Sequence, residues 1–358
     1  MKQQTYGWFL SLGLLVLTAC GGNKDSANGG AAGGATGGAA TPTFSLSWSE
    51  YPSWSVFGVA DELGLINGAA GEMGEIEKEF GVDIELKEAG YDSCLNMFTS
   101  NECDAVCMTN MDALIVSPSR PCVAVLPTST SYGADACLVT EAIADIDALK
   151  SQVVHGLENT VSQYCFVRCL EVAGKDEKDY TFKNLDPAVA ATSMQQRSDA
   201  HQAIMVWNPF VLQTLRDRSD VRVLFDSTQI PGEIVDMVVV GADVLDKPKA
   251  DDFVKAVAKT FYEVGKAMEE AGRGDEILVA LGKKFSNLGL EDMKIVVEQT
   301  QFYKTPEIAR ELIQGDEFKQ KMQTVIDFCE KHDLVKDATV GYGDDAGQYS
   351  LRFDVSRL

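Results

Sequence analysis

Residues 44–64 read FSLSWSEYPSWSVFGVADELG, and this stretch decides the fold. Residues 44–48 predict a strand, and residues 56–63 predict a helix that ends near Gly64. The loop between them, residues 49–54, is polar and aromatic. In open α/β sheets ligands bind beyond the carboxyl ends of the strands, so this loop is a candidate for ligand contact.

The same alternation of short apolar runs and helical patterns continues along the chain. A first set predicts a helix at 91–99 and strands at 82–86, 105–108, 122–126 and 136–139. A second set begins near Ala142, with a helix at 160–173 capped by Gly174 and strands at 153–154, 203–207, 221–225 and 237–240. The alternation predicts an α/β fold of right-handed βαβ units, with parallel sheets covered on both faces.

The last third of the chain is mostly helical in pattern. Helices are predicted at 253–271, 275–284, 291–302 and 315–332, and the tail after Val340 has no assignable pattern. This order predicts two lobes, the first made of residues 43–133 plus 240–358 and the second of residues 134–239. Two chain crossings, near 128–133 and near 239–241, would form the hinge between them.

The N-terminus predicts export and a lipid anchor. Lys2 precedes an apolar run at 8–19 that is too short for a membrane span of about 20 residues, so residues 1–19 predict a signal peptide. The sequence LTACG at 17–21 resembles a bacterial lipobox, which implies cleavage before Cys20 and a lipid on its thiol. The alternative is an ordinary signal peptide with a chance cysteine.

Residues 20–42 predict a flexible tether behind the lipidated cysteine. They are dominated by Gly, Ala, Ser, Thr and Asn, and such a segment buries too little apolar surface to offset its ordering entropy. Its root-mean-square reach is roughly 25 Å. The tether would let the folded body move over a membrane partner.

Charge and cysteine content narrow the class of protein further. The formal net charge of −23 argues against nucleic acid and anionic lipid as partners. Nine cysteines less Cys20 leave an even number, which in an exported protein suggests disulfides. Buried free thiols and a metal site are the alternatives. No histidine stands at zinc-ligand spacing from a cysteine pair, so we expect no metal.

The loops that follow the predicted strands carry carboxylates and aromatic rings but no Lys, Arg or His. Carboxylates beside aromatic faces suit a cation, whereas an anion would need basic side chains or bare helix N-termini. Helix capping is the main alternative role for Asp112, and a core position is the alternative for both Trp residues. The candidate ligand-binding residues are Glu50, Trp54, Asp112, Tyr132, Glu158, Trp207, Asn208, Glu233 and Asp236.

The sequence lacks the common catalytic signatures. It has no Gly-x-Ser-x-Gly elbow, no phosphate-binding glycine loop with Lys, and no His-Glu-x-x-His zinc motif. Nothing in the sequence fixes two carboxylates at a separation suited to acid–base catalysis. We therefore expect a binding protein without a cofactor rather than an enzyme.

Several segments resemble a known family. SWSEYPSW at 47–54 and VADELG at 59–64 resemble the taurine, sulfonate, nitrate and thiamine-precursor binding proteins of ABC importers. MTNMDAL at 108–114, VWNP at 206–209 and STQIPGEIVD at 227–236 are similar to the branch encoded beside urea carboxylase, which is associated with guanidine import. The likeness covers about residues 44–271. The remaining cysteines, residues 194–200 and the tail after Val340 depart from the family pattern.

The resemblance implies a two-lobed periplasmic-binding-protein type II fold (a Venus flytrap) with a helical C-terminal return. It implies a monomer that is lipid-anchored outside the cytoplasmic membrane, that serves an ABC permease and ATPase, and that captures guanidinium. The alternatives are urea, another cation, taurine or another sulfonate, nitrate, or a thiamine pyrimidine precursor. A pyrimidine-synthesising enzyme of the same fold would need a reactive histidine and metal handling, and three scattered histidines support this poorly.

Overall fold

A computed structural model describes residues 40–284, 288–343 and 347–358. The predicted signal peptide, Cys20 and nearly all of the predicted tether lie outside these residues. Residues Thr41–Leu358 form one compact unit. Among the residues described, none of the helices combines the length and the apolar character that a membrane crossing needs.

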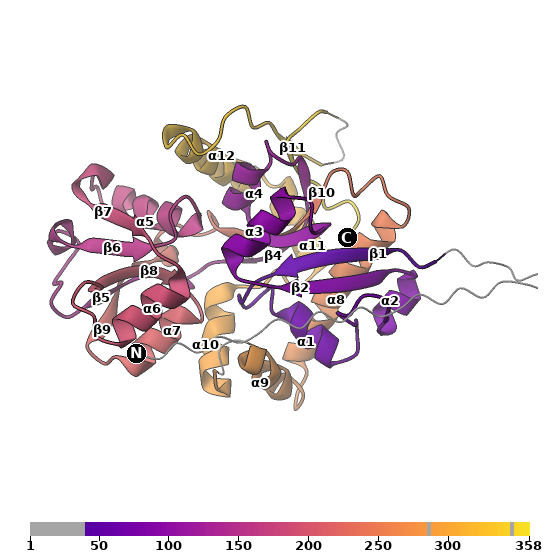
Figure 1. Cartoon of the computed structure of the whole chain (residues 1–358), viewed down its shortest axis with the longest axis horizontal. Coiled ribbons are helices and arrows are strands. Elements are labelled where there is room, and N and C mark those ends of the chain that lie inside the picture. The colour runs from indigo at the N-terminus through magenta and orange to yellow at the C-terminus, as the bar shows by residue number, and fades with distance from the viewer. Residues whose placement is uncertain (1–39, 285–287, 344–346) are drawn as a thin grey trace, which may run out of the picture. The chain divides into compact units, whose positions relative to one another are not determined.

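A seven-stranded sheet, in the order β11-β12-β4-β10-β3-β1-β2, forms the first half of this unit, which we call lobe 1 (Figure 1). Its strands are β1 (Thr43–Trp48), β2 (Asp83–Glu88), β3 (Ala105–Thr109), β4 (Cys122–Thr130), β10 (Val235–Gly241), β11 (Val340–Tyr342) and β12 (Leu351–Phe353). Its helices are α1 (Val56–Glu62), α2 (Glu75–Phe80), α3 (Tyr91–Thr99), α4 (Asn110–Val116), α8 (Ala250–Glu269), α9 (Gly274–Lys284), α10 (Leu290–Thr300), α11 (Pro306–Gln314) and α12 (Asp316–Lys331).

A five-stranded sheet, in the order β7-β6-β8-β5-β9, forms the second half, which we call lobe 2. Its strands are β5 (Asp135–Thr140), β6 (Val153–Gly156), β7 (Thr181–Asn184), β8 (Ala203–Trp207) and β9 (Val221–Asp226). Its helices are α5 (Val161–Val172), α6 (Pro187–Gln195) and α7 (Phe210–Asp217), with short 3₁₀ turns η1 (Ala148–Ser151), η2 (Glu177–Asp179) and η3 (Ser227–Gln229).

The predicted α/β class is confirmed, but the prediction of purely parallel sheets is wrong. Strand β10 runs antiparallel to β3 and β4, and β5 runs antiparallel to β8 and β9. Only residues 131–134 join β4 to β5, and a parallel crossover within one sheet needs a dozen residues or more. The chain instead passes directly from one sheet to the other. The first residues of β5 and β10 therefore lie beside the carboxyl ends of their neighbours.

The second crossing also differs from its predicted place near 239–241. The chain leaves lobe 2 at Asp226 and joins the lobe 1 sheet at Val235, so the crossing is residues 227–234. Residues 235–239, which the sequence assigned to the second lobe, form a buried strand between β3 and β4. The apolar run alone could not show which sheet it would join.

The two crossings are hydrogen-bonded to each other. The Ser131 and Ser227 hydroxyls lie 2.7 Å apart, and the Gly133 N–H donates to the Ser227 hydroxyl at 2.7 Å. The Ser131 N–H donates to the Ile234 carbonyl at 3.2 Å. Gly133 has a φ of 96°, a conformation that side chains with a Cβ rarely adopt. The paired crossings are the only covalent links between the two sheets within residues 40–284.

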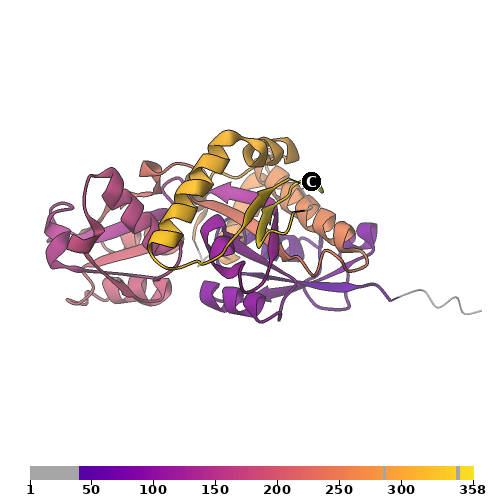
Figure 2. The ribbon, with the colours of Figure 1, turned by 90° about the horizontal axis from the view of Figure 1, so that it is seen from above.

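Helix α12 belongs to lobe 1, and its C-terminal end extends to lobe 2, as Figure 2 shows. Its Lys331 pairs with Glu171 at 3.2 Å and with Glu177 at 3.1 Å, and His332 Nε2 lies 2.7 Å from Glu177. The ring of Phe328 meets another ring, that of a lobe 2 tyrosine, edge to face. The helical return thus contacts both halves of the unit.

Local signals in the sequence explain where several elements begin and end. Helix α5 ends before Gly174, whose φ is 70°, as its cap position predicted. The tail contains β11 and β12, which the sequence did not predict, because three-residue strands give too little periodicity to detect. In the core, Phe44 of β1 stacks on Phe253 of α8 with ring centroids 4.6 Å apart.

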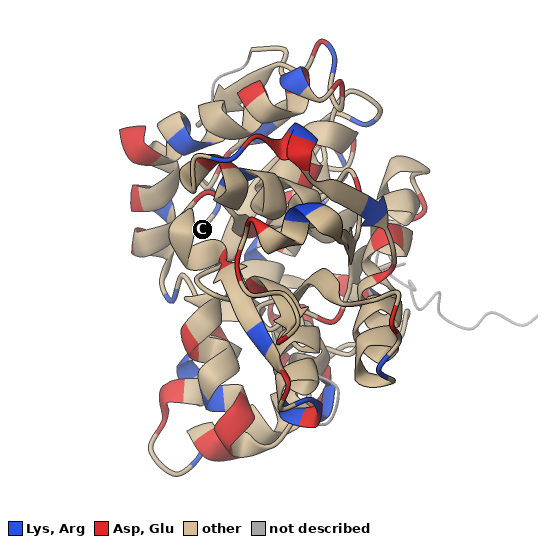
Figure 3. Cartoon of the chain, turned by 90° about the vertical axis from the view of Figure 1, so that its left-hand side faces the viewer, with Lys and Arg blue, Asp and Glu red and all other residues tan. Residues whose placement is uncertain are grey.

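The eight cysteines that the structure describes are all buried free thiols, so the predicted disulfides are not borne out. Seven of them lie in strands and helices and Cys103 lies in the loop before β3, and at each of these buried positions the thiol packs as a small apolar group. Burial raises the pKa of the Cys94 and Cys122 thiols to about 12. Figure 3 shows Lys and Arg residues interspersed with Asp and Glu residues, and several of them form exposed ion pairs.

Candidate functional site

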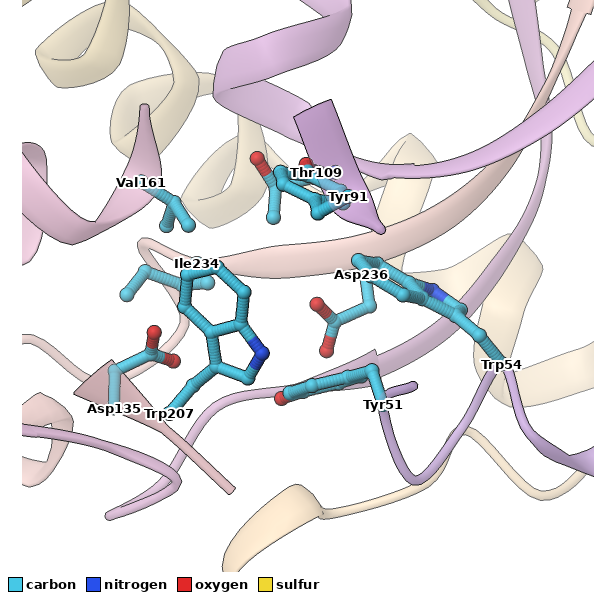
Figure 4. A pocket seen from close by; sticks show the side chains of 9 residues that line it. All are labelled: Tyr51, Trp54, Tyr91, Thr109, Asp135, Val161, Trp207, Ile234 and Asp236. Atoms are coloured by element: carbon cyan, nitrogen blue, oxygen red, sulfur yellow. Dashed lines mark hydrogen bonds between the residues drawn. The ribbon is translucent and has the colours of Figure 1, made fainter. Parts of the chain in front are cut away.

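A cavity lined by buried residues lies between the two lobes (Figure 4). The atom-free space at this position, including the part open to solvent, is about 260 Å³, and each residue that lines it is at most 6 % exposed. Both sheets and one of the crossings contribute to its wall. The lining residues are Tyr51, Trp54, Tyr91, Thr109, Asp135, Val161, Trp207, Ile234 and Asp236.

Four aromatic rings form much of the cavity wall. The rings of Trp54 and Tyr91 stack with centroids 5.5 Å apart and an interplanar angle of 11°. Tyr51 tilts against Trp54 at 4.8 Å, and Trp207 meets Tyr91 edge to face at 5.8 Å. Such a group of rings offers negative π faces to an enclosed cation.

The carboxylate of Asp236 lies among these rings (Figure 4). Asp236 is the second residue of β10 and pairs in register with Thr109 of β3 and Ser129 of β4, which places it at the carboxyl edge of the lobe 1 sheet. The Ser129 hydroxyl donates to it at 2.5 Å. Burial raises the pKa of Asp236 well above its ordinary value, and the charge of Asp135 raises it further.

Asp135 supplies a second carboxylate from lobe 2. It begins β5 opposite Trp207 of β8, at the carboxyl edge of the second sheet. The residue is 2 % exposed, and burial raises its pKa to about 7, while a hydrogen bond from Ser131 opposes the rise. Each lobe therefore contributes one buried carboxylate, and within the described part of the chain no basic residue stands beside either of them.

Asp112 lies behind the wall of the cavity. It sits in the first turn of α4, whose N-cap Thr109 donates to its carboxylate at 2.8 Å. The Tyr91 hydroxyl donates to the same oxygen at 2.5 Å, so Asp112 fixes the Tyr91 ring against the cavity. Burial raises the pKa of Asp112 to about 6, and hydrogen bonds from Tyr91, Thr109 and the Val161 backbone oppose the rise.

The chemistry of the lining follows from these residues. Among the residues that the structure describes, no Lys, Arg or His lines the cavity. The hydroxyl of Tyr51 is buried beside Asp236, and burial raises its pKa well above the ordinary value, with the negative charges of Asp236 and Asp135 adding to the rise. A buried hydroxyl and two unpaired carboxylates favour a ligand that carries positive charge and N–H donors.

Three of the sequence-predicted residues line the cavity, namely Trp54, Trp207 and Asp236. Glu50 lines an adjoining open groove instead. Tyr132 is 43 % exposed and meets α10 through its backbone N–H, which donates to Gln299. These positions separate residues that the sequence grouped into one site.

The remaining predicted residues serve other contacts. Asn208 is buried, and its side chain donates to Gln299 at 2.7 Å. Glu158 is partly exposed outside the cavity, and its N–H donates to Asn184 at 3.0 Å. Glu233 is paired with a cationic side chain of the protein, because Arg168 donates to both of its carboxylate oxygens.

Two residues that the sequence analysis passed over matter most here. Asp135 precedes its strand, and only an antiparallel strand brings its first residue to the binding edge. Tyr91 is the first residue of α3, which follows β2. The residues after β2 were not among the strand ends that the sequence analysis considered. The acidic start of an apolar strand just after Gly133 was the available signal for Asp135.

Comparison with known proteins gives the fold. No protein-family profile matches the chain, and no curated protein matches it. Its fold matches the alkanesulfonate-binding protein SsuA from Xanthomonas axonopodis pv. citri bound to MOPS, at 14% identity over 82% of this chain and 94% of that one, with a TM-score of 0.66. It also matches the sulphonate-binding SsuA from Escherichia coli, at 19% identity over 82% and 88%, with a TM-score of 0.63.

A third match is the periplasmic nitrate-binding protein NrtA from Synechocystis PCC 6803, at 14% identity over 83% of both chains, with a TM-score of 0.60. The chain has the periplasmic binding protein fold. This confirms the predicted two-lobed fold class. At these identities the likeness extends to the fold alone, because one fold supports many ligands.

Proposed function

We propose that this chain is the extracytoplasmic solute-binding protein of an ABC importer and that its ligand is guanidinium. The observation that carries the proposal is the cavity wall, in which Asp135 and Asp236 face four aromatic rings without a basic residue in the lining. Two buried carboxylates at neutral pH need either protons or a cation. A cationic ligand supplies the missing charge.

The shape of the cavity favours a small, flat cation. Trp54 and Tyr91 stack on each other, and flat, weakly hydrated faces such as those of guanidinium pack well on such rings. Guanidinium also carries N–H groups on every edge, which match in-plane carboxylate oxygens. The space between these buried side chains is small, so a ligand of a few heavy atoms is appropriate.

The same wall argues against the ligands that the similar structures are named for. Sulfonate and nitrate are anions, and an anion beside Asp135 and Asp236 would meet like charge in a site of low dielectric constant. The amide N–H groups at the start of α5 are an anion-binding feature, but the Asp112 carboxylate already interacts with the Val161 backbone there. A basic partner for an anion is lacking among the described lining residues.

The rest of the proposal concerns location and partners. Cleavage before Cys20 and lipidation of its thiol would hold the protein at the outer side of the cytoplasmic membrane, where an ABC permease and ATPase receive the ligand. The basis is the sequence LTACG at 17–21. Mass spectrometry of the chain purified from membranes tests this: a mature N-terminus at any residue other than Cys20, without lipid, would contradict it.

A ligand screen tests the function. Thermal-shift measurements with guanidinium, methylguanidinium, urea, taurine and nitrate should show the largest stabilisation with guanidinium, since a ligand that binds only the folded state stabilises it. Calorimetry then gives the affinities. A stronger response to taurine or nitrate than to guanidinium would overturn the proposal.

A further inference from the structure

An open groove adjoins the cavity. It encloses about 940 Å³ of atom-free space, and both lobes line it: residues 49–50 and 88–91 come from lobe 1, and residues 186–188, 207 and 210 come from lobe 2. The groove therefore lies where the two lobes meet, and it is far larger than the cavity beside it.

Two aromatic residues line both spaces. Tyr91 of lobe 1 and Trp207 of lobe 2 line the cavity as well as the groove, and their rings touch edge to face. Tyr91 is fixed by its hydrogen bond to Asp112, whereas Trp207 belongs to the opposite lobe. Separation of the lobes would part these two rings and join the groove to the cavity.

The groove is acidic and has an unsatisfied polar group. Its charged lining residues are Glu50, Glu88 and Asp186, and among the described residues no Lys, Arg or His lines it. Ser49, which also lines it, is 4 % exposed, and its hydroxyl has no hydrogen-bond partner. A buried hydroxyl without a partner in a space that large points to a polar solute.

We propose that this groove is the access route to the cavity, that its carboxylates concentrate cations, and that the Tyr91–Trp207 contact is the gate. The proposal deepens the proposed function and rests on it for the identity of the ligand. A cleft lined by one sign of charge raises the local concentration of counter-ions and their association rate by about 10- to 1000-fold. Glu88 and Asp186 attract cations through their electrostatic field and need no direct contact with them. Asp186 can therefore contribute while its carboxylate caps α6.

The first arm of the test measures the field without any assumption about the ligand. Ala188→Cys places a thiol in the groove, and its reaction rates with a cationic trimethylammonium methanethiosulfonate and an anionic sulfonatoethyl methanethiosulfonate are compared. The full chain without this change gives the background, since the eight described native thiols are buried. Adding Glu88→Gln and Asp186→Asn should lower the cation-to-anion rate ratio about three- to tenfold.

A matched pair of exposed carboxylates elsewhere is the control. Glu276→Gln on α9 and Asp316→Asn on α12 remove the same charge and should leave the ratio unchanged, because screening at physiological salt limits their reach to about 8 Å. Asparagine is as good an N-cap residue as aspartate, so Asp186→Asn preserves α6. An unchanged ratio in the groove variant overturns the proposal.

The second arm uses guanidinium chloride and stopped-flow tryptophan fluorescence. The groove variant should associate about three- to tenfold more slowly at low salt, with an unaltered dissociation rate, and the difference should vanish near 0.5 M salt. A change confined to dissociation overturns the proposal. If guanidinium fails to bind the unaltered chain while the reagent ratio still falls, the assigned ligand is wrong and the cation-concentrating groove stands.

Discussion

The guanidinium of Arg168 holds the carboxylate of Glu233 through two hydrogen bonds of 2.9 and 3.0 Å. The hydroxyl of Tyr164 donates to the same carboxylate at 2.5 Å. Glu233 lies on the second crossing and Arg168 on α5, so the pair ties a connecting segment to lobe 2. The carboxylate that the sequence proposed for a guanidinium ligand is already occupied by a guanidinium of the protein.

Breaking this pair should cost stability more than ligand affinity. The side chains of Arg168 and Glu233 are 19 % and 13 % exposed, so removing one partner leaves a poorly hydrated charge. Arg168→Met and Glu233→Gln should each lower the free energy of unfolding by roughly 2 kcal/mol, below the range for fully buried pairs because water still reaches them. Urea denaturation of both single variants and the double variant measures the cost and the coupling.

The control for that experiment is Arg216→Met. Among the described residues, Arg216 forms two solvent-accessible ion pairs, at 3.4 and 3.5 Å, and its removal should change stability by less than about 0.5 kcal/mol. The affinity of Glu233→Gln for guanidinium should stay within about threefold of that of the unaltered chain, because Glu233 does not line the cavity. A tenfold loss of affinity would correspond to about 1.4 kcal/mol of binding free energy. A tenfold loss of affinity with unchanged stability would instead place Glu233 in contact with the ligand.

The two cavity carboxylates should carry the affinity. Asp135→Asn and Asp236→Asn each replace a charged acceptor by a neutral one, and a hydrogen bond to a charged group contributes about 1.5–3 kcal/mol. Each variant should therefore bind guanidinium roughly 10- to 100-fold more weakly in calorimetry. Glu158→Gln, outside the cavity, is the matched control. Unchanged affinity in both aspartate variants would refute this account of the site.

The sequence located three of the nine residues that line this site, for a reason visible in individual residues. Trp54, Trp207 and Asp236 were found because they lie in the segments that follow predicted strands, where ligands of this class of sheet bind. Asp135 was missed because a strand's direction is not visible in its residues. Glu233 was assigned to the ligand because nothing in the sequence links it to Arg168, 65 positions away.

The fold was predictable for a similar reason. Apolar runs and helix caps, such as Gly174, are local and determine elements directly. The sheet that a strand joins is decided by long-range packing, so the run that became β10 was placed in the wrong lobe. The cysteines show the same limit, because their even number suggested pairing while their packing keeps them apart as thiols.

Guanidinium affinity should rise with pH. Burial raises the pKa of Asp135 to about 7 and that of Asp236 well above its ordinary value, so the empty cavity holds protons in mildly acidic solution. Guanidinium stays charged throughout this range, since its pKa, like that of the arginine side chain, lies far above neutral pH. The cation favours the ionised carboxylates, and its binding must release those protons below the pKa of the empty site.

The linkage between proton release and guanidinium binding determines the sign and the size of this pH dependence. The association constant should fall by up to about one decade per pH unit for each proton released, as pH drops from about 7 to 5.5. Calorimetry at several pH values, in buffers of different ionisation enthalpy, counts the protons. Asp135→Asn should flatten the profile near pH 7. An affinity that is constant or rises on acidification contradicts the assignment of these carboxylates.

Ligand binding should close the lobes about the two crossings at 131–134 and 227–234. The Ser131–Ser227 hydrogen bond of 2.7 Å lets the two segments bend together, and each lobe brings one carboxylate to the cavity. Small-angle scattering should show a smaller radius of gyration with saturating guanidinium. The double variant of Asp135→Asn and Asp236→Asn should show no change. An unchanged radius with binding confirmed by calorimetry would count against closure.

Urea should bind far more weakly than guanidinium, although the two have nearly the same size and shape. Guanidinium has four heavy atoms, and a ceiling of about −1.5 kcal/mol per atom gives roughly −6 kcal/mol, or a dissociation constant of tens of micromolar. Urea lacks the charge, and one of its edges presents an oxygen to Asp135 or Asp236, both at most 2 % exposed. A buried carboxylate left without its donor costs roughly 2–5 kcal/mol, so urea should bind at least about 30-fold more weakly. Part of that cost can be avoided by protonation, because burial already raises the pKa of both carboxyls, so the gap between the ligands should widen as pH rises above 7. Competition calorimetry at pH 6 and pH 8 measures both effects. Equal affinity for urea and guanidinium at pH 8 would show that the cavity recognises a planar shape and not a cation.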